Sequence, residues 1–202
     1  MPRHVFRRSS ISVWAALCLG ASIASAAAAV LVVGNSKGHE CYLAAKSGID
    51  TRAGLELCNE ALDDGGMNAK DIAATHVNRG VLLDTLARYS EALADFNKSI
   101  EFNPDLGDGY LNRGVSLIRL KRLDEAFADV QKGITLGVSV PEIGYYDRAV
   151  AEELMGRIKD AYYDYKKCLE IAPGYTPASD ALKYFTVTRV PAKPKTAPNG
   201  GT

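Results

Sequence analysis

Apolar residues recur at helical spacing along most of the chain, with polar residues between them. Two of the clearest runs hold Val81, Leu82, Leu83, Leu86 and then Val115, Leu117, Ile118, Leu120. Residues three or four apart share one face of a helix, so each run predicts a helix with one buried face. The pattern indicates an all-α chain.

Parts of this pattern repeat after 34 residues. The tripeptide Asn-Arg-Gly at residues 78–80 recurs at 112–114, and the pair Glu-Ala at 91–92 recurs at 125–126. Self-similarity at a fixed period is typical of stacked repeats, in which each unit buries its apolar face against its neighbours. We therefore expect a stack of helix pairs.

The unit resembles the tetratricopeptide repeat, a helix–turn–helix motif of 34 residues. Counted from Ala73, the small-residue positions hold Gly80 and Ala92, the aromatic position holds Phe96 and the closing proline is Pro104. Small residues let the two helices approach closely, and the residue before a proline leaves the helical region. The resemblance covers residues 35–188 and implies an α-solenoid of antiparallel helix pairs.

Three repeats account for the middle of this domain, with weaker elements on either side. The repeats are expected at residues 73–106, 107–140 and 142–175. A degenerate hairpin with a short first helix is expected at 36–63, and a capping helix is expected at 178–185. Pro, Lys, Gly and Thr dominate residues 189–202, which indicates a disordered tail.

Residues 1–29, the leader, have the features of a secretory signal peptide. Three arginines precede an uncharged stretch that ends in a run of small residues. We expect cleavage between Ala26 and Ala29 and a periplasmic or secreted protein. The alternative is an uncleaved membrane anchor, because residues 30–33 extend the apolar run past the ~20 residues that span a bilayer.

The charge balance argues against a nucleic-acid partner. Lys plus Arg and Asp plus Glu both number 24, and removal of the leader takes three arginines and no acids, which leaves −3. A protein that neutralises phosphates needs a basic surface, which this composition does not supply. We expect a protein or peptide partner, and a membrane contact only if the leader is retained.

Cysteines suggest one structural bridge. In a repeat of this kind Cys41 and Cys58 fall on facing positions of the first hairpin, so a disulfide is expected there in an oxidising compartment. Two buried thiols are the alternative. Cys168 is expected to be a buried structural thiol.

The sequence offers no catalytic or metal-binding constellation. Its three histidines are scattered, and His76 is expected to pack in place of an aromatic residue. Motifs of metalloproteases, serine hydrolases and nucleotide triphosphatases do not occur. We therefore expect a protein that is not an enzyme and needs no cofactor.

The resemblance implies a concave groove lined by the first helix of each repeat. Its candidate partner-binding residues are Val77, Asn78, Val81, Asp84, Leu111, Asn112, Val115, Tyr146, Asp147 and Val150. Tyr146 is the expected apolar anchor, since aromatic residues are enriched among binding hot spots. Members of the family that bind chaperone tails use a Lys and an Asn to hold the terminal carboxylate of the tail. This chain has Val77 and Val81 at the places of the first Lys and Asn. That specialised activity is not expected.

Two amides in the groove suggest how a partner would be held. The side chains of Asn78 and Asn112 can each donate to and accept from a peptide backbone, whatever the partner's side chains are. The alternative is that both amides only support the neighbouring repeat. Two functions remain open: an interaction module that binds a peptide segment, and a structural or self-associating envelope protein with no dedicated peptide ligand.

Overall fold

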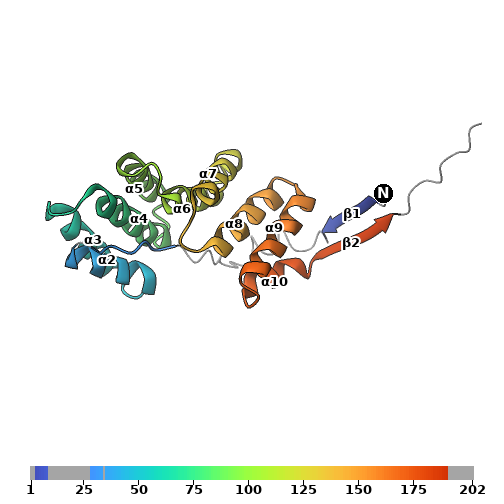
Figure 1. The fold of residues 1–202 in the computed structure, drawn as a ribbon, viewed down its shortest axis with the longest axis horizontal. Coiled ribbons are helices and arrows are strands. Elements are labelled where there is room, and N and C mark those ends of the chain that lie inside the picture. The colour runs from blue at the N-terminus through green and yellow to red at the C-terminus, as the bar shows by residue number, and fades with distance from the viewer. Residues whose placement is uncertain (1–2, 9–27, 34, 191–202) are drawn as a thin grey trace, which may run out of the picture.

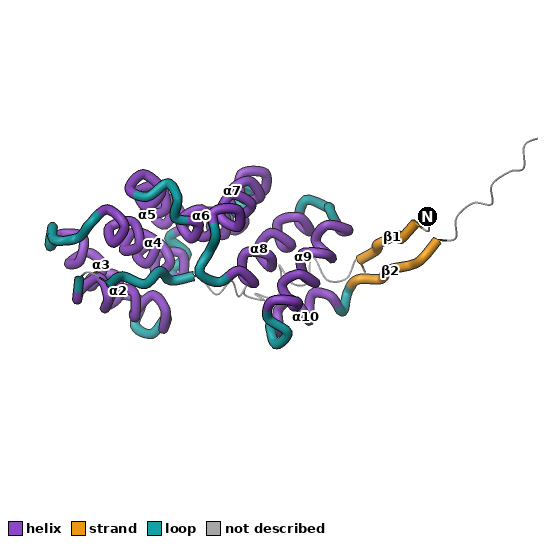
Figure 2. Tube along the Cα trace, viewed as in Figure 1, coloured by secondary structure: helices purple, strands orange, loops and turns teal. Residues whose placement is uncertain are grey.

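The computed structural model describes residues 3–8, 28–33 and 35–190. Within them, helices stack in antiparallel pairs along an elongated body, and two short strands extend from one end (Figure 1; Figure 2). The elements are β1 (Arg3–Arg8), α2 (Ser36–Ser47), α3 (Thr51–Asp63), α4 (Ala69–Thr85), α5 (Tyr89–Phe102), α6 (Gly107–Arg119), α7 (Leu123–Leu136), α8 (Pro141–Leu154), α9 (Ile158–Ile171), α10 (Thr176–Leu182) and β2 (Phe185–Val190). The expected all-α solenoid is confirmed.

The three expected repeats correspond to the pairs α4–α5, α6–α7 and α8–α9, which pack as hairpins. The degenerate hairpin is the pair α2–α3, and its first helix begins at Ser36, at the expected start of the hairpin. Helix α4 also begins earlier, at Ala69, because the side chain of Asn68 caps it by accepting from the Asp71 amide. Among the described residues no helix is both long and apolar enough to cross a bilayer.

Close helix contacts within the hairpins depend on glycine. A Cβ atom on Gly80 would lie 2.5 Å from the ring of Phe96, and one on Gly114 would lie 2.6 Å from Cγ2 of Val130. Phe96 and Val130 are both buried, so these contacts lie inside the core. Glycine therefore sets how closely the two helices of a hairpin can pack.

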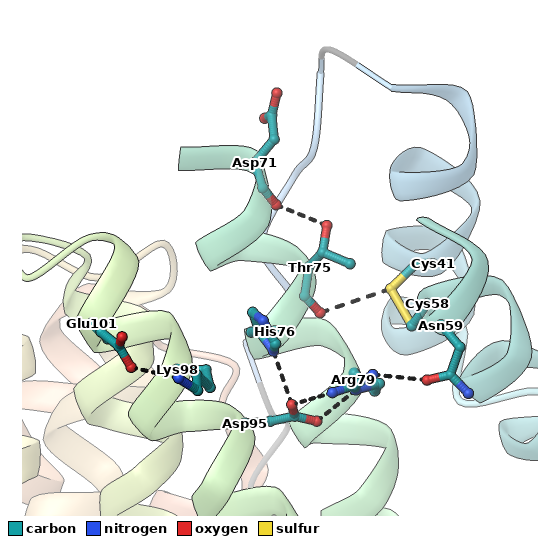
Figure 3. Close-up of polar contacts among 10 residues, drawn as sticks. All are labelled: Cys41, Cys58, Asn59, Asp71, Thr75, His76, Arg79, Asp95, Lys98 and Glu101. Carbon is teal, nitrogen blue, oxygen red and sulfur yellow. Dashed lines mark hydrogen bonds and ion pairs between the residues drawn. A yellow bond between two sulfur atoms is a disulfide. The ribbon is translucent and has the colours of Figure 1, made fainter. Parts of the chain in front are cut away.

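The first hairpin is closed by a disulfide between Cys41 and Cys58, which joins α2 to α3 (Figure 3). Both cysteines are fully buried in the cluster that also holds Val77 and Phe96. The disulfide therefore closes the degenerate hairpin, and its buried sulfur atoms pack in the core of the first full repeat. The third described cysteine in the repeats, Cys168, is free and buried, and burial raises its thiol pKa to about 11.

At the other end the chain forms a strand that the sequence did not predict. Helix α10 ends at Leu182, and β2 pairs antiparallel with β1, with Arg8 opposite Phe185 and Arg3 opposite Val190. The β-branched residues of β2 favour an extended conformation. The expected tail thus begins inside β2, and its residues 191–202 lie outside the described part.

Candidate peptide-binding groove

Residues Ala28–Val33, which we call the strap, lie across the first helices of the stack. Asn78 of α4 binds Val30 of the strap twice, although 48 residues separate them. The Val30 amide donates to Oδ1 of Asn78 at 2.8 Å, and Nδ2 of Asn78 donates to the Val30 carbonyl at 2.8 Å. One side chain thus satisfies both main-chain groups of a strap residue.

The next repeat makes a related contact. Nδ2 of Asn112 donates to the Ala28 carbonyl at 3.1 Å and to the Asp108 carbonyl of its own helix at 2.9 Å. Asn78 is fully buried and Asn112 is 3% exposed. Because a buried amide is costly unless it is hydrogen-bonded, the strap satisfies groups that would otherwise need water.

Strap side chains alternate between the groove and solvent. Ala28 and Val32 are buried, whereas Leu31 is 54% exposed and Val33 is 82% exposed. The side chain of Val32 packs on Gly38, where an added Cβ would lie 2.7 Å from it. This alternation is that of an extended chain with one face against the protein.

Apolar groove residues pack beneath the strap or inside the repeats. Val77 and Val81 belong to a buried cluster against which Ala29 and Val30 pack. Leu111 packs in a separate cluster between the second and third repeats, and Val115 is also buried. The structure therefore brings the first two valines to the strap and leaves Leu111 a core residue.

Asp84 joins two repeats instead of facing an open groove. Its carboxylate accepts a hydrogen bond from the hydroxyl of Ser116 at 2.6 Å and forms an ion pair with Nε of Arg119 at 3.0 Å, both on α6. Burial raises the pKa of Asp84, against the opposing effects of the Ser116 hydrogen bond and the Arg119 charge. This carboxylate supports the stacking of neighbouring repeats.

The third repeat presents aromatic and acidic groups. Tyr146 is half-buried against Tyr165 and Tyr175, with ring centroids 5.6 and 5.3 Å away, and Val150 packs nearby. Asp147 is fully buried. Burial raises the pKa of Tyr146 to about 12, and the negative charge of Asp147 adds to this rise.

A cation from β1 occupies this end of the stack. Arg8 forms an ion pair with Glu153 of α8, and Glu153 also accepts a hydrogen bond from the Tyr165 hydroxyl at 3.0 Å. The guanidinium of Arg8 also lies 5.5 Å from the ring centroid of Phe185. Glu153 of α8 thus pairs with a positively charged side chain from the leader.

Sequence reasoning missed a row of arginines that ties the repeats together. Arg79, Arg113 and Arg148 each bind an aspartate of their own hairpin with two hydrogen bonds and an amide oxygen of the preceding hairpin with a third. Figure 3 shows the first of these, in which Arg79 lies between Asp95 and Asn59. The 34-residue recurrence of Arg beside Asn could have indicated this role.

His76 belongs to the same polar cluster. Its Nδ1 lies 2.9 Å from the Asp95 carboxylate (Figure 3). Its ring stacks on Phe102. Burial acts to raise the pKa of Asp95, but hydrogen bonds from Arg79 and His76 outweigh it and lower that pKa. His76 is thus a packing residue with a polar partner. The described residues include no group of acids, histidines and cysteines arranged to hold a metal.

Comparison with known families identifies the repeat. Residues 73–106 match the tetratricopeptide repeat family model, over the unit expected from the sequence. The chain contains a tetratricopeptide repeat. The search of curated proteins found no match to its sequence.

Solved structures of this family share the fold. The first tetratricopeptide domain of Spaghetti (RPAP3), bound to an HSP90 peptide, has a TM-score of 0.54 and 23% identity over 56% of this chain and 90% of that chain. The Arabidopsis OM64 tetratricopeptide domain has a TM-score of 0.55 and 21% identity, over 57% of this chain and 95% of that chain. MamA from Desulfovibrio magneticus RS-1 has a TM-score of 0.57 and 14% identity, over 74% of this chain and 84% of that chain. At these identities the likeness concerns the tetratricopeptide fold.

Proposed function

We propose that this protein is an interaction module whose groove binds an extended polypeptide by its main chain. The observation that carries this proposal is the pair of hydrogen bonds between Asn78 and Val30. An amide that pairs with both main-chain groups of one residue does not depend on that residue's side chain. The same contact could therefore hold a segment of another protein.

The strap is the intramolecular counterpart of such a ligand. Because it is joined to the repeats, its effective concentration is on the order of millimolar, so a partner must compete with it. An extended partner that fits would place small or apolar residues where Ala28, Val30 and Val32 lie. Residues at the places of Leu31 and Val33 would point to solvent and could be of any type.

The preferred partner is not an acidic chaperone tail. Relatives in the structural comparison include RPAP3 domains bound to HSP90 and HSP70 peptides. In this chain Val77 and Val81 are buried where tail-binding members of the family carry Lys and Asn. A neutral or basic segment suits the acidic end of the groove, where Glu153 binds Arg8.

A second function follows from the same contact. If the strap never leaves the groove, the protein is a structural or self-associating component with no dedicated peptide ligand. The full burial of Val32 against α2 favours this alternative, because burying an aliphatic side chain stabilises the bound state by about 1.5–3 kcal/mol. Self-association of the full chain would then appear as a concentration-dependent mass in light scattering.

We further propose export to the periplasm or the exterior, with cleavage in the expected window on the N-terminal side of Ala28, so that the strap is kept. The supporting features are the order of charged, apolar and small residues in the leader and the Cys41–Cys58 disulfide. The proposed binding role requires no catalytic group and no cofactor.

The test is a peptide titration with the full chain. The probe is a fluorescent peptide of residues 28–37, added to a Val30→Pro variant, in which the strap loses the amide that donates to Asn78. We expect saturable binding, weakened at least tenfold when Asn78 and Asn112 are also replaced by Ala.

A matched control is Asn59→Ala, which removes an exposed amide that accepts from Arg79 outside the groove. It should leave the affinity unchanged. Equal binding by the Val30→Pro protein and its double-Asn derivative would contradict main-chain recognition in the groove. Failure of both to bind any peptide would favour the structural alternative.

A further inference from the structure

A second surface that holds an extended chain lies at the end of the stack opposite α2. There β1, which belongs to the leader, pairs antiparallel with β2 (Figure 1). The described strands form this one two-stranded sheet. The proposed cleavage would remove β1 and leave β2 with an open edge. Main-chain N–H and C=O groups at an open edge pair readily with another extended segment.

One residue of β1 covers aromatic rings of α9. The ring centroid of Phe6 lies 5.4 Å from that of Tyr162 and 5.6 Å from that of Tyr163. Phe6 is partly buried, whereas its neighbours Val5 and Arg7 are exposed, as on a strand with one face against the protein. Loss of β1 would therefore uncover apolar surface on both tyrosines.

A second residue of β1 occupies a cation site. Arg8 pairs with Glu153 of α8, and the exposed fractions of the two side chains are 10% and 8%. The guanidinium also lies 5.5 Å from the centroid of the Phe185 ring, and Glu153 accepts from the Tyr165 hydroxyl at 3.0 Å. A carboxylate beside aromatic rings favours a guanidinium, which forms both charge-assisted hydrogen bonds and cation–π contacts.

We propose that β2 and α9 of the processed protein bind an extended segment of a partner that carries an arginine two places after an aromatic residue. The segment pairs antiparallel with β2, as β1 does here. Its arginine pairs with Glu153, and its aromatic residue lies on Tyr162 and Tyr163. The spacing of two is needed because side chains two apart on a strand share one face.

This site is distinct from the groove that holds the strap. Its contacts come from α8, α9 and β2, whereas the strap is held by Asn78 of α4 and Asn112 of α6. The proposal therefore goes beyond main-chain recognition in the groove, and it rests on the proposed export, because loss of the leader uncovers β2.

The contacts of β1 favour such a segment over a second copy of this chain. In a second copy the exposed strand is β2 itself, where Val187 stands two places before Arg189. Valine has no ring to meet those of Tyr162 and Tyr163, so pairing of two β2 strands lacks the aromatic contact that Phe6 makes. The partner is a different polypeptide.

The experiment displaces β1 and supplies it as a peptide. The probe is a fluorescent peptide of residues 3–8, titrated into the full chain carrying Phe6→Ala and Arg8→Ala. These changes remove both side-chain contacts of β1, and a two-stranded pairing without them is marginal in water. We expect saturable binding, at least about tenfold weaker when Glu153→Gln is added, because the buried ion pair then lacks its carboxylate. Gln keeps an oxygen that accepts from Tyr165, so the fold should tolerate it.

Two controls separate this pairing from general attraction between a basic peptide and acidic groups. In the protein, Glu101→Gln removes an exposed acid of α5 and should leave the affinity unchanged. In the peptide, Arg8→Ala and Arg7→Ala each remove one positive charge, but it is Arg8 that pairs with Glu153, and Arg7 is exposed. Arg8→Ala should weaken binding at least about tenfold, and Arg7→Ala by less than about threefold. Equal losses would overturn the proposal.

The groove variants distinguish this site from the proposed function. Binding that weakens on loss of Asn78 and Asn112, but not with Glu153→Gln, would place the peptide in the groove, which overturns this inference and leaves the proposed function standing. No binding of the peptide, or a dimer of the chain that the peptide does not dissociate in light scattering, would also overturn it. An intact leader on the exported protein, read by N-terminal sequencing, would keep the site covered and refute the proposal through the proposed processing instead.

Discussion

Gly80 of α4 lies directly against the ring of Phe96 of α5, with no room for a side chain between them. A Cβ atom at residue 80 would lie 2.5 Å from Cε1 of that ring and 2.8 Å from Cζ. The same relationship recurs one repeat later between Gly114 and Val130. These contacts define the hairpin packing on which the groove is built.

Replacement of Gly80 or Gly114 by Ala should destabilise the protein by about 1–3 kcal/mol, since overpacking forces the backbone to shift. The sign of the stability change is informative, because Gly→Ala at an exposed position inside a helix stabilises by about 1 kcal/mol. Thermal unfolding of the variants measures the effect. Gly66→Ala, with nothing within 4 Å of the added Cβ, is the control and should change little. Unchanged melting temperatures of both the Gly80→Ala and the Gly114→Ala variants would contradict the close packing described here.

The turn between the two helices of each hairpin offers a stabilising change. Ala87 and Lys121 have φ angles of 57° and 60°, and the equivalent residue of the third hairpin is Gly156 at 76°. A left-handed conformation costs a non-glycine residue about 1–2 kcal/mol, partly offset by the greater freedom of glycine in the unfolded chain. Ala87→Gly and Lys121→Gly should therefore stabilise by roughly 0.5–1 kcal/mol in denaturant titrations, and Gly156→Ala should destabilise.

Glu152 makes stability depend on pH. Burial raises its pKa from 4.5 to about 7, with the charge of Asp164 adding to the rise and that of Arg148 opposing it. The folded protein therefore holds a proton on Glu152 at pH values where the unfolded chain has lost it. This contribution to stability is complete below pH 4.5 and is lost as the pH rises through 7.

Glu152→Gln should remove that dependence. Relative to the original protein, the variant should be more stable at pH 8 by about 1–2 kcal/mol, a figure reduced for partial solvent screening, and nearly equal at pH 5. Melting temperatures at the two pH values measure the difference. If the difference in melting temperature between the two proteins were the same at pH 5 and pH 8, Glu152 would not titrate in this range.

The periodic part of the fold could be predicted from the sequence, because each hairpin carries its own packing residues. Gly80, Ala92 and Phe96 lie within one unit, and their spacing is set by helix geometry. The disulfide could also be predicted, since Cys41 and Cys58 belong to one hairpin. The recurrence of Arg79 as Arg113 could have indicated the row of arginines, but residue type alone does not distinguish the buried pair of Arg79 and Asp95 from surface charges.

The strap could not be predicted, because its partners lie 48 and 84 residues away. Residues 30–33 continue the apolar run of the leader, and nothing local distinguishes a segment that lies in a groove from one that spans a bilayer. The sequence did single out Asn78 and Asn112 as candidate main-chain binders, with support of the neighbouring repeat as the alternative. What it lacked was the segment that they bind.

The central claim is that Asn78 holds an extended segment by its main chain, and amide hydrogen exchange at Val30 tests it most directly. In the full chain we predict that the Val30 amide exchanges at least about tenfold more slowly than in an Asn78→Ala variant that keeps its melting temperature. Asn78→Asp, which retains an acceptor oxygen, should protect this amide better than Ala does. A Val30 amide that exchanges equally fast with Asn, Asp or Ala at residue 78 would contradict the account.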